Sequence, residues 1–247
     1  MKNLNFIPCD TLKPFIKSFV ISEVEQESNY KVLPDTGLVI GFQYKGRLDK
    51  IENNKSTSLA ISGITGLADR SGTFRNSNNI GTVLVFFREA GAAQFFRQPL
   101  HELFRESISL DNFMLRSELL FLEEELAESK SDNKRISAVE RFLIARMKNT
   151  EPDKLVLAAL ALVHKSKGNI RISELVDQLH ISQSPLEKRF RQAVGTSPKK
   201  FASIVRLKYV VNEYNRKSLL TEVGYEAGFY DQAHFIKEFK TSLVSRL

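Results

Sequence analysis

The chain has 247 residues, of which 42% are hydrophobic and 26% charged, as expected for a globular protein of two domains. Its net charge is +7, and a single cysteine, Cys9, excludes an internal disulfide and a cysteine-rich zinc site. The sequence has no apolar run long enough to cross a membrane and no signal-peptide core. We therefore expect a cytoplasmic protein without a membrane partner.

The first 100 residues carry the pattern of β structure. Short runs rich in Val, Ile, Phe and Leu predict strands over residues 15–24, 38–44, 59–64 and 82–87. Turn-forming stretches such as Pro34-Asp35-Thr36-Gly37 separate these runs. Several short strands at this spacing predict a small β barrel or sandwich.

From residue 89 onwards the apolar residues recur at helical spacing. This period predicts helices over residues 91–97, 111–128, 133–148 and 153–165. Asp111 and Asp132 are the expected N-caps, and Pro152 suits a first helical turn. Residues 111–148 would then form a helical hairpin attached to the β domain.

We place the domain boundary near residue 150. Residues 1–150 would form a β-rich sensor or oligomerisation domain, and residues 151–247 an all-α domain, so the predicted fold class is α+β. The all-α part holds 16 Lys and Arg against 10 Asp and Glu, whereas residues 1–150 hold 20 against 19. This asymmetry favours a nucleic-acid partner for the all-α domain, although a solvated basic surface would explain it equally well.

The last 80 residues contain an internal repeat. Ile172-Ser173-Glu174-Leu175-Val176 matches Leu220-Thr221-Glu222-Val223-Gly224 at an offset of 48, and further matches follow at an offset of 49. Each copy predicts a short helix, a tight turn and a second helix, which together form a helix-turn-helix unit. A helix predicted over residues 199–217 would span about 28 Å. The two second helices would then lie roughly one DNA turn apart, in successive major grooves.

The second helix of each copy separates an apolar face from a polar one. In the first copy the residues predicted for the core are Leu186, Phe190 and Val194. Its exposed stripe, of the kind that lies along a major groove, consists of Ser184, Glu187, Lys188 and Arg191. The corresponding outward residues of the second copy are Gln232, Ala233, Ile236, Lys237 and Lys240. Two copies with matching basic positions predict DNA binding.

Three segments carry a family resemblance. Gly195-Thr196-Ser197-Pro198-Lys199-Lys200-Phe201, followed by Arg206-Leu207, resembles the end of the first unit in the AraC/XylS (arabinose-operon regulator) family. Residues 224–235 resemble the signature segment of that family, and residues 34–104 look like the β domain of one bacterial subgroup, from which no ligand follows.

The resemblance implies a transcription regulator that binds double-stranded DNA sequence-specifically, with RNA polymerase as a partner if it activates. It also implies a set of groove-facing residues, which correspond here to Ser184, Glu187, Lys188, Gln232, Ala233, His234, Ile236 and Lys237. A DNA-phosphate contact and simple surface exposure are both open for His234, which falls in the first turn of its helix.

The second unit departs from the family pattern. Ala233 and Ile236 lack hydrogen-bonding groups, so this helix would read thymine methyl groups or only position the protein. At an offset of 49, the glycine and proline of the first unit would recur at positions occupied by Val244 and Leu247. We therefore expect the all-α domain to lack its last helix and the second unit to bind DNA weakly.

Catalytic and metal chemistry find no support in the sequence. The histidines His101, His164, His180 and His234 are far apart, and none has a second ligand at metal-binding spacing. We expect His101 and His164 to be structural. No phosphate-binding loop, dinucleotide fingerprint or nucleophile elbow occurs. We predict no catalytic residue, no metal and no cofactor.

Two interpretations of the N-terminal domain remain open. It could sense a small-molecule effector, or it could serve only as a dimerisation or protein-interaction module, with a homodimer as the expected assembly. A pocket lined by residues of the β domain would favour the first interpretation. A large exposed apolar face on the helical hairpin would favour the second.

Overall fold

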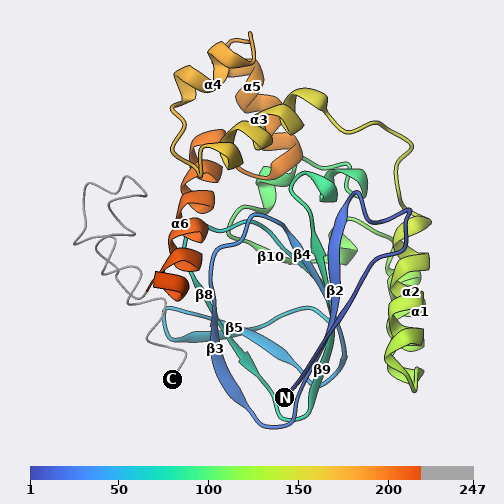
Figure 1. Ribbon diagram of the computed structural model, residues 1–247. Helices are drawn as coiled ribbons and strands as arrows, with labels where there is room; N and C mark the ends of the chain where they lie inside the picture. Colours follow the sequence, from blue (N-terminus) through green and yellow to red (C-terminus); the bar gives the residue numbers. More distant parts are fainter. Residues whose placement is uncertain (218–247) are drawn as a thin grey trace.

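The computed structural model describes residues 1–217, in which two antiparallel β-sheets precede a group of helices (Figure 1). The first sheet has the strand order β1-β2-β9-β4-β7-β10, and the second has the order β3-β8-β5-β6. The strands are β1 (Lys2–Phe6), β2 (Ile16–Val24), β3 (Ser28–Val32), β4 (Val39–Lys45), β5 (Leu48–Glu52), β6 (Lys55–Ser58), β7 (Ser62–Thr65), β8 (Gly72–Asn76), β9 (Ile80–Phe87) and β10 (Ser107–Ser109).

Alternating side chains give the first sheet two different faces. Ile40 and Phe42 of β4 are fully buried, and the ring of Phe42 meets that of Phe142 edge to face at 6.1 Å. Phe142 belongs to α2 (Asp132–Ile144), which with α1 (Arg116–Glu128) forms the hairpin seen at the right of Figure 1. Val39 and Gly41, which alternate with Ile40 and Phe42 along β4, line a cavity between the two sheets. This is the two-residue period of a strand with different environments on its two sides.

The helix starts in the middle of the chain differ from those predicted. Asp111 does not cap a helix, because Leu110–Asn112 form a 3-10 turn, η3, whose Leu110 is buried. The N-cap of α2 is Ser131, whose hydroxyl accepts a hydrogen bond from the Lys134 amide at 3.4 Å. The predicted helix at residues 91–97 is a 3-10 turn, η1 (Gly91–Gln94), and a second such turn, η2 (Leu100–Leu103), follows it. At α2 the cap therefore lies one residue before the predicted Asp132, and serine and aspartate are both favoured at an N-cap.

The remaining helices form a group at one end of the sheets (Figure 1). They are α3 (Lys154–Lys165), α4 (Ile172–Gln178), α5 (Gln183–Val194) and α6 (Pro198–Lys217). Asp153 caps α3 by accepting from the amides of Leu155 and Val156, so Pro152 precedes the helix and does not lie in its first turn. Within residues 1–217, no helix has the length and apolar character needed to span a bilayer.

Candidate nucleic-acid interface

Helices α4 and α5 form the first predicted helix-turn-helix unit. The amide of Arg171 donates to the Glu174 carboxylate at 3.1 Å, which closes the first turn of α4. His180 adopts a left-handed conformation (φ 51°) in the turn, and Ser182 stands at the N-cap of α5. Pro185 follows at the third helical position, where its missing amide proton removes no intrahelical hydrogen bond. The sequence thus produces the sharp turn that orients α5.

The inner face of α5 is a core of apolar side chains. Leu186, Phe190 and Val194 are buried as predicted, and the Phe190 ring meets that of Phe201 on α6 at 5.5 Å. The C-terminus of α5 ends at Gly195 with φ 97°, a left-handed conformation that glycine adopts without strain. These contacts hold α5 in a fixed orientation with its other face towards solvent.

An ion pair fixes α5 to α3. The Arg189 guanidinium donates two hydrogen bonds to the Asp153 carboxylate, at 2.7 and 2.8 Å. Partial burial would raise the pKa of Asp153, but Arg189 and the capped backbone amides outweigh it and lower this pKa. Arg189 is therefore engaged within the protein, although local sequence alone does not separate it from the other cations of α5.

The predicted stripe lies on the outer face of α5. Ser184, Lys188 and Arg191 are exposed, and Glu187 is half-buried between its neighbours. The Glu187 carboxylate accepts from the Gln183 side-chain amide at 2.9 Å and lies 3.6 Å from the Arg191 guanidinium. All five residues line one shallow concavity. The surface can offer hydroxyl, ammonium and guanidinium donors to a nucleic acid, with one carboxylate between them.

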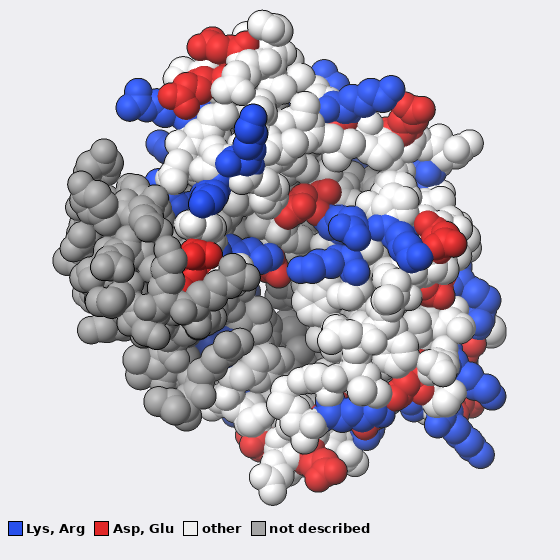
Figure 2. Space-filling model, in the orientation of Figure 1, with Lys and Arg blue, Asp and Glu red and all other residues white. Residues whose placement is uncertain are grey.

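Six of the predicted DNA-binding residues cannot be placed. They belong to the second unit, which lies outside the described residues: Gln232, Ala233, His234, Ile236, Lys237 and Lys240. The expectation of a missing last helix also concerns residues outside this range. In the described part, Lys and Arg are interspersed with Asp and Glu across the face shown in Figure 2.

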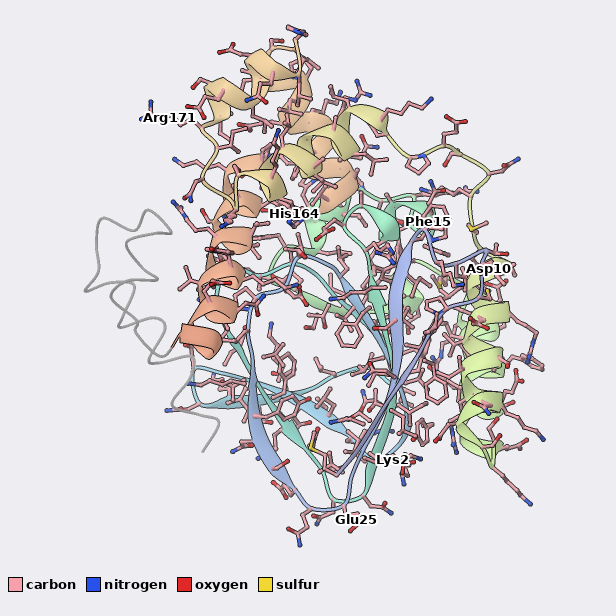
Figure 3. All side chains as sticks on the ribbon, viewed as in Figure 1. Lys2, Asp10, Phe15, Glu25, His164 and Arg171 are labelled. Atoms are coloured by element: carbon pink, nitrogen blue, oxygen red, sulfur yellow. The ribbon has the colours of Figure 1, made fainter. Side chains whose placement is uncertain are left out.

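The helices contact the N-terminal domain at several points. Leu100 of η2 lies against the end of α5, where a Cβ added to Gly195 would come within 3.2 Å of its carbonyl oxygen. Lys208 of α6 forms an ion pair with Asp35 in the loop between β3 and β4. Figure 3 shows His164 of α3 at the junction between helices and sheets, where it lies 3.2 Å from the Glu89 carboxylate. The buried apolar core is continuous across this junction.

The contact between Glu89 and His164 predicts a pH dependence. Burial would raise the pKa of Glu89, but hydrogen bonds from His164 and Thr36 outweigh it and lower this pKa from 4.5 to about 2. A carboxyl with a lowered folded pKa stabilises the fold above its unfolded pKa, and this contribution disappears as pH falls from 4.5 towards about 2. Wild type should therefore be more stable than Glu89→Gln at pH 6, and the difference should shrink below pH 4.5.

Urea unfolding between pH 3 and 6 measures this difference. Glu102→Gln is the control, because it makes the same change at an exposed residue of η2. A constant difference between wild type and Glu89→Gln over the whole range would contradict the assignment.

Family profiles match both parts of the chain. A profile for a helix-turn-helix domain matches residues 175–243, and a profile for a domain of unknown function matches residues 4–109. The first match spans both predicted copies. No curated protein sequence matches the chain.

Comparison with solved structures matches most of the chain to two proteins at low sequence identity. ToxT from Vibrio cholerae is 11% identical with a TM-score of 0.47, and the match covers 91% of this chain and 93% of ToxT. A fatty acid-bound form of ToxT from Vibrio cholerae strain SCE256 gives 12% identity, 92% coverage of both chains and a TM-score of 0.45. The AraC-like transcriptional activator CuxR is 15% identical with a TM-score of 0.36, covering 86% of this chain and 80% of CuxR.

The helix-turn-helix match and the geometry of α4 and α5 define a DNA-binding protein of the helix-turn-helix class. Residues 175–243 are therefore a helix-turn-helix domain, and the segments after α5 and at residues 224–235 resemble those of AraC-type transcription regulators. This assignment rests on the C-terminal match and its motifs.

Proposed function

We propose that α5 is a recognition helix that reads the DNA major groove through Ser184, Glu187, Lys188 and Arg191. The observation that carries this proposal is the position of the stripe, which faces solvent directly opposite the buried Leu186, Phe190 and Val194. Lys188 lies nearer the N-terminal end of the helix, which usually meets base edges. Arg191, one turn further, is suited to a backbone phosphate. Substitution of each residue tests these roles, and the expected results open the Discussion.

The N-terminal domain, we further propose, senses a small and largely apolar molecule. A cavity of about 190 Å³ lies between the two sheets, lined mainly by apolar side chains such as Val39, Leu84, Phe86 and Ile108. An apolar cavity of about 150 Å³ is large enough for benzene. Gly41 pairs with Gly63 across β4 and β7, and both glycines line the cavity, so two missing side chains enlarge it.

A second observation connects this cavity with the DNA-binding helices. An adjoining cavity of about 100 Å³ shares Val39 with the first and is also lined by Pro34, Asp35 and Gly37 of the loop before β4. Asp35 in this loop pairs with Lys208 of α6. A ligand that shifts the loop would therefore change a contact with the helix that follows α5. Such differential contact is what ligand control of DNA binding requires.

Filling the cavity should abolish ligand binding without unfolding the protein. In Gly41→Leu the added Cβ would lie 3.5 Å from Leu84 and 3.8 Å from Thr82, so the side chain enters the cavity at ordinary contact distances. Small aromatic and aliphatic alcohols serve as probes in a thermal-shift measurement. A probe that binds the cavity should raise the melting temperature of wild type, since a ligand stabilises the state that binds it. The same alcohols should not raise that of Gly41→Leu.

Thr57→Leu on the exposed strand β6 is the matched control, because it adds a similar side chain away from the cavity. Equal stabilisation of wild type and Gly41→Leu by every probe would refute the cavity as the sensing site. If the cavity is the sensing site, a probe that raises the melting temperature should also change the affinity for DNA in wild type and in Thr57→Leu.

The alternative function is dimerisation through the helical hairpin. Leu115 and Phe121, at the start and on the surface of α1, are 68% and 72% exposed, so both side chains are available for contact with a second copy. A homodimer through this face would bring two copies of α5 into one assembly. Sedimentation of wild type and Phe121→Ser distinguishes the functions, because a dimerisation module loses its dimer in the variant.

We propose the cytoplasm as the site of action and RNA polymerase as a partner only if the protein activates transcription.

A further inference from the structure

A histidine of the N-terminal domain lies beside the recognition helix. His101 is an exposed residue of η2 and lines the same concavity as Ser184, Lys188 and Arg191. The sequence does not predict this proximity, because more than 80 positions lie between His101 and α5. The fold brings them together by packing η1 and η2 against α5.

The position of His101 is fixed by its neighbours. Leu100 and Leu103 on either side are each only 2% exposed and belong to the core that continues into the helices. Leu100 also lies against the end of α5 at Gly195. The backbone of η2 is thus held between the sheets and α5, while the imidazole projects from it into the concavity.

The chemistry of this concavity suits a phosphate. An imidazole carries at least one N–H donor in either protonation state. The charged groups that share the concavity are Lys188 and Arg191, which attract phosphate, and Glu187, whose charge is offset by Arg191 at 3.6 Å. Glu102, the neighbour of His101, does not line it. Most protein–DNA hydrogen bonds go to phosphate and sugar, and these contacts set the orientation of the protein on the duplex.

We propose that His101 donates a hydrogen bond to a DNA phosphate beside the one bound by Arg191. The N-terminal domain then forms one wall of the DNA interface and fixes how α5 lies in the groove. The inference rests on the proposed role of α5 as the recognition helix. It gives the sensing domain a direct contact with DNA in addition to its contacts with the helices.

A charge series at His101 tests the proposal. His101→Lys should tighten binding of a duplex selected from a random library, and of an unrelated duplex of equal length, by about three- to tenfold. It should also steepen the salt dependence by about one unit of slope between 50 and 200 mM salt. His101→Glu should weaken both complexes by at least the same factor. The full-length protein is used throughout, and circular dichroism confirms that each variant is folded.

Glu102→Gln is the matched control, since it removes one negative charge at the adjacent exposed position outside the concavity and so raises the net charge by one, as His101→Lys does. Equal effects of His101→Lys and Glu102→Gln would overturn the proposal, because both would then act through the overall field. Tighter binding by His101→Ala would also overturn it and show that η2 obstructs DNA. If Lys188→Ala and Arg191→Ala are equally without effect, the assignment of α5 itself fails. If these two weaken binding and the His101 series does not, only the role of His101 is wrong.

Discussion

Lys188→Ala should relax the sequence preference of DNA binding more than it weakens binding to unrelated DNA. Lys188 is exposed on the outer face of α5, in the half of the helix that enters the groove first. Loss of a good contact to a base edge costs about 1–3 kcal/mol of discrimination at that position. The measurement compares affinities for the preferred duplex and for single-base variants of it, with wild type and Lys188→Ala.

The companion variant Arg191→Ala should behave differently. Arg191 lies one turn beyond Lys188 and is exposed, so its expected partner is a phosphate, which is the same for every sequence. All duplexes should lose affinity alike, and the salt slope should fall by about one. The ion pair with Glu187 reduces this loss only slightly, because exposed pairs contribute at most about 1 kcal/mol.

Gln192→Ala serves as the control for both variants, since Gln192 is exposed on the same helix but does not line the concavity. Its DNA affinity should match that of wild type. The recognition-helix assignment would be refuted if Lys188→Ala and Arg191→Ala bound the preferred duplex as wild type does at every salt concentration.

The parts of this fold that follow local rules were predictable from the sequence. The helix predicted over residues 199–217 is α6 (Pro198–Lys217), and the predicted core residues of α5 are buried. Both depend on helical period, on Pro198 at a helix start and on Gly195 at a helix end, signals contained within a few residues. The groove-facing stripe follows from the same period once the buried face is known.

The second sheet was not predictable in the same way. The four predicted strands correspond to β2, β4, β7 and β9, all in the first sheet, whereas no strand of the second was predicted. Strand β6 shows why: its sequence Lys-Ser-Thr-Ser has no apolar residue, and all four residues are exposed. It is held through pairing with β5, where the Asp49 carboxylate accepts from the hydroxyls of Ser56 and Ser58. The partner of such a strand is set by the pairing register between two strands, and the sequence of one strand alone does not specify this register.

The same limit applies to the interface. Arg189 and Arg191 are both exposed cations on α5, yet only Arg189 is engaged by Asp153, a residue 36 positions earlier. His101 lies beside α5 through tertiary packing alone. Residue type and helical period identified which face of α5 is available, but the neighbours of that face come from the assembled fold.

Phe190→Ala should cause the largest loss of stability among the substitutions considered for the DNA-binding helices. Phe190 is fully buried, and its ring meets that of Phe201 at 5.5 Å, which in turn meets the His164 ring at 5.9 Å. The variant would leave a cavity where α5 and α6 converge. Substitution of a buried phenylalanine by alanine costs about 3–5 kcal/mol. Because a whole domain is stable by only about 5–15 kcal/mol, this loss should unfold a measurable fraction of the protein near its working temperature.

Urea unfolding followed by circular dichroism measures the free energy of unfolding of each variant. Phe190→Leu should recover much of the loss, since it restores most of the buried volume and leaves a smaller cavity. Phe121→Ala supplies the contrast: the same deletion at a side chain that is 72% exposed should change stability by less than about 0.5 kcal/mol. DNA affinity should fall in Phe190→Ala in proportion to the unfolded fraction and return under conditions that restore folding. A loss of stability no larger than that of Phe121→Ala would show that α5 does not pack on α6 as described. The proposed orientation of the recognition stripe would then also be wrong.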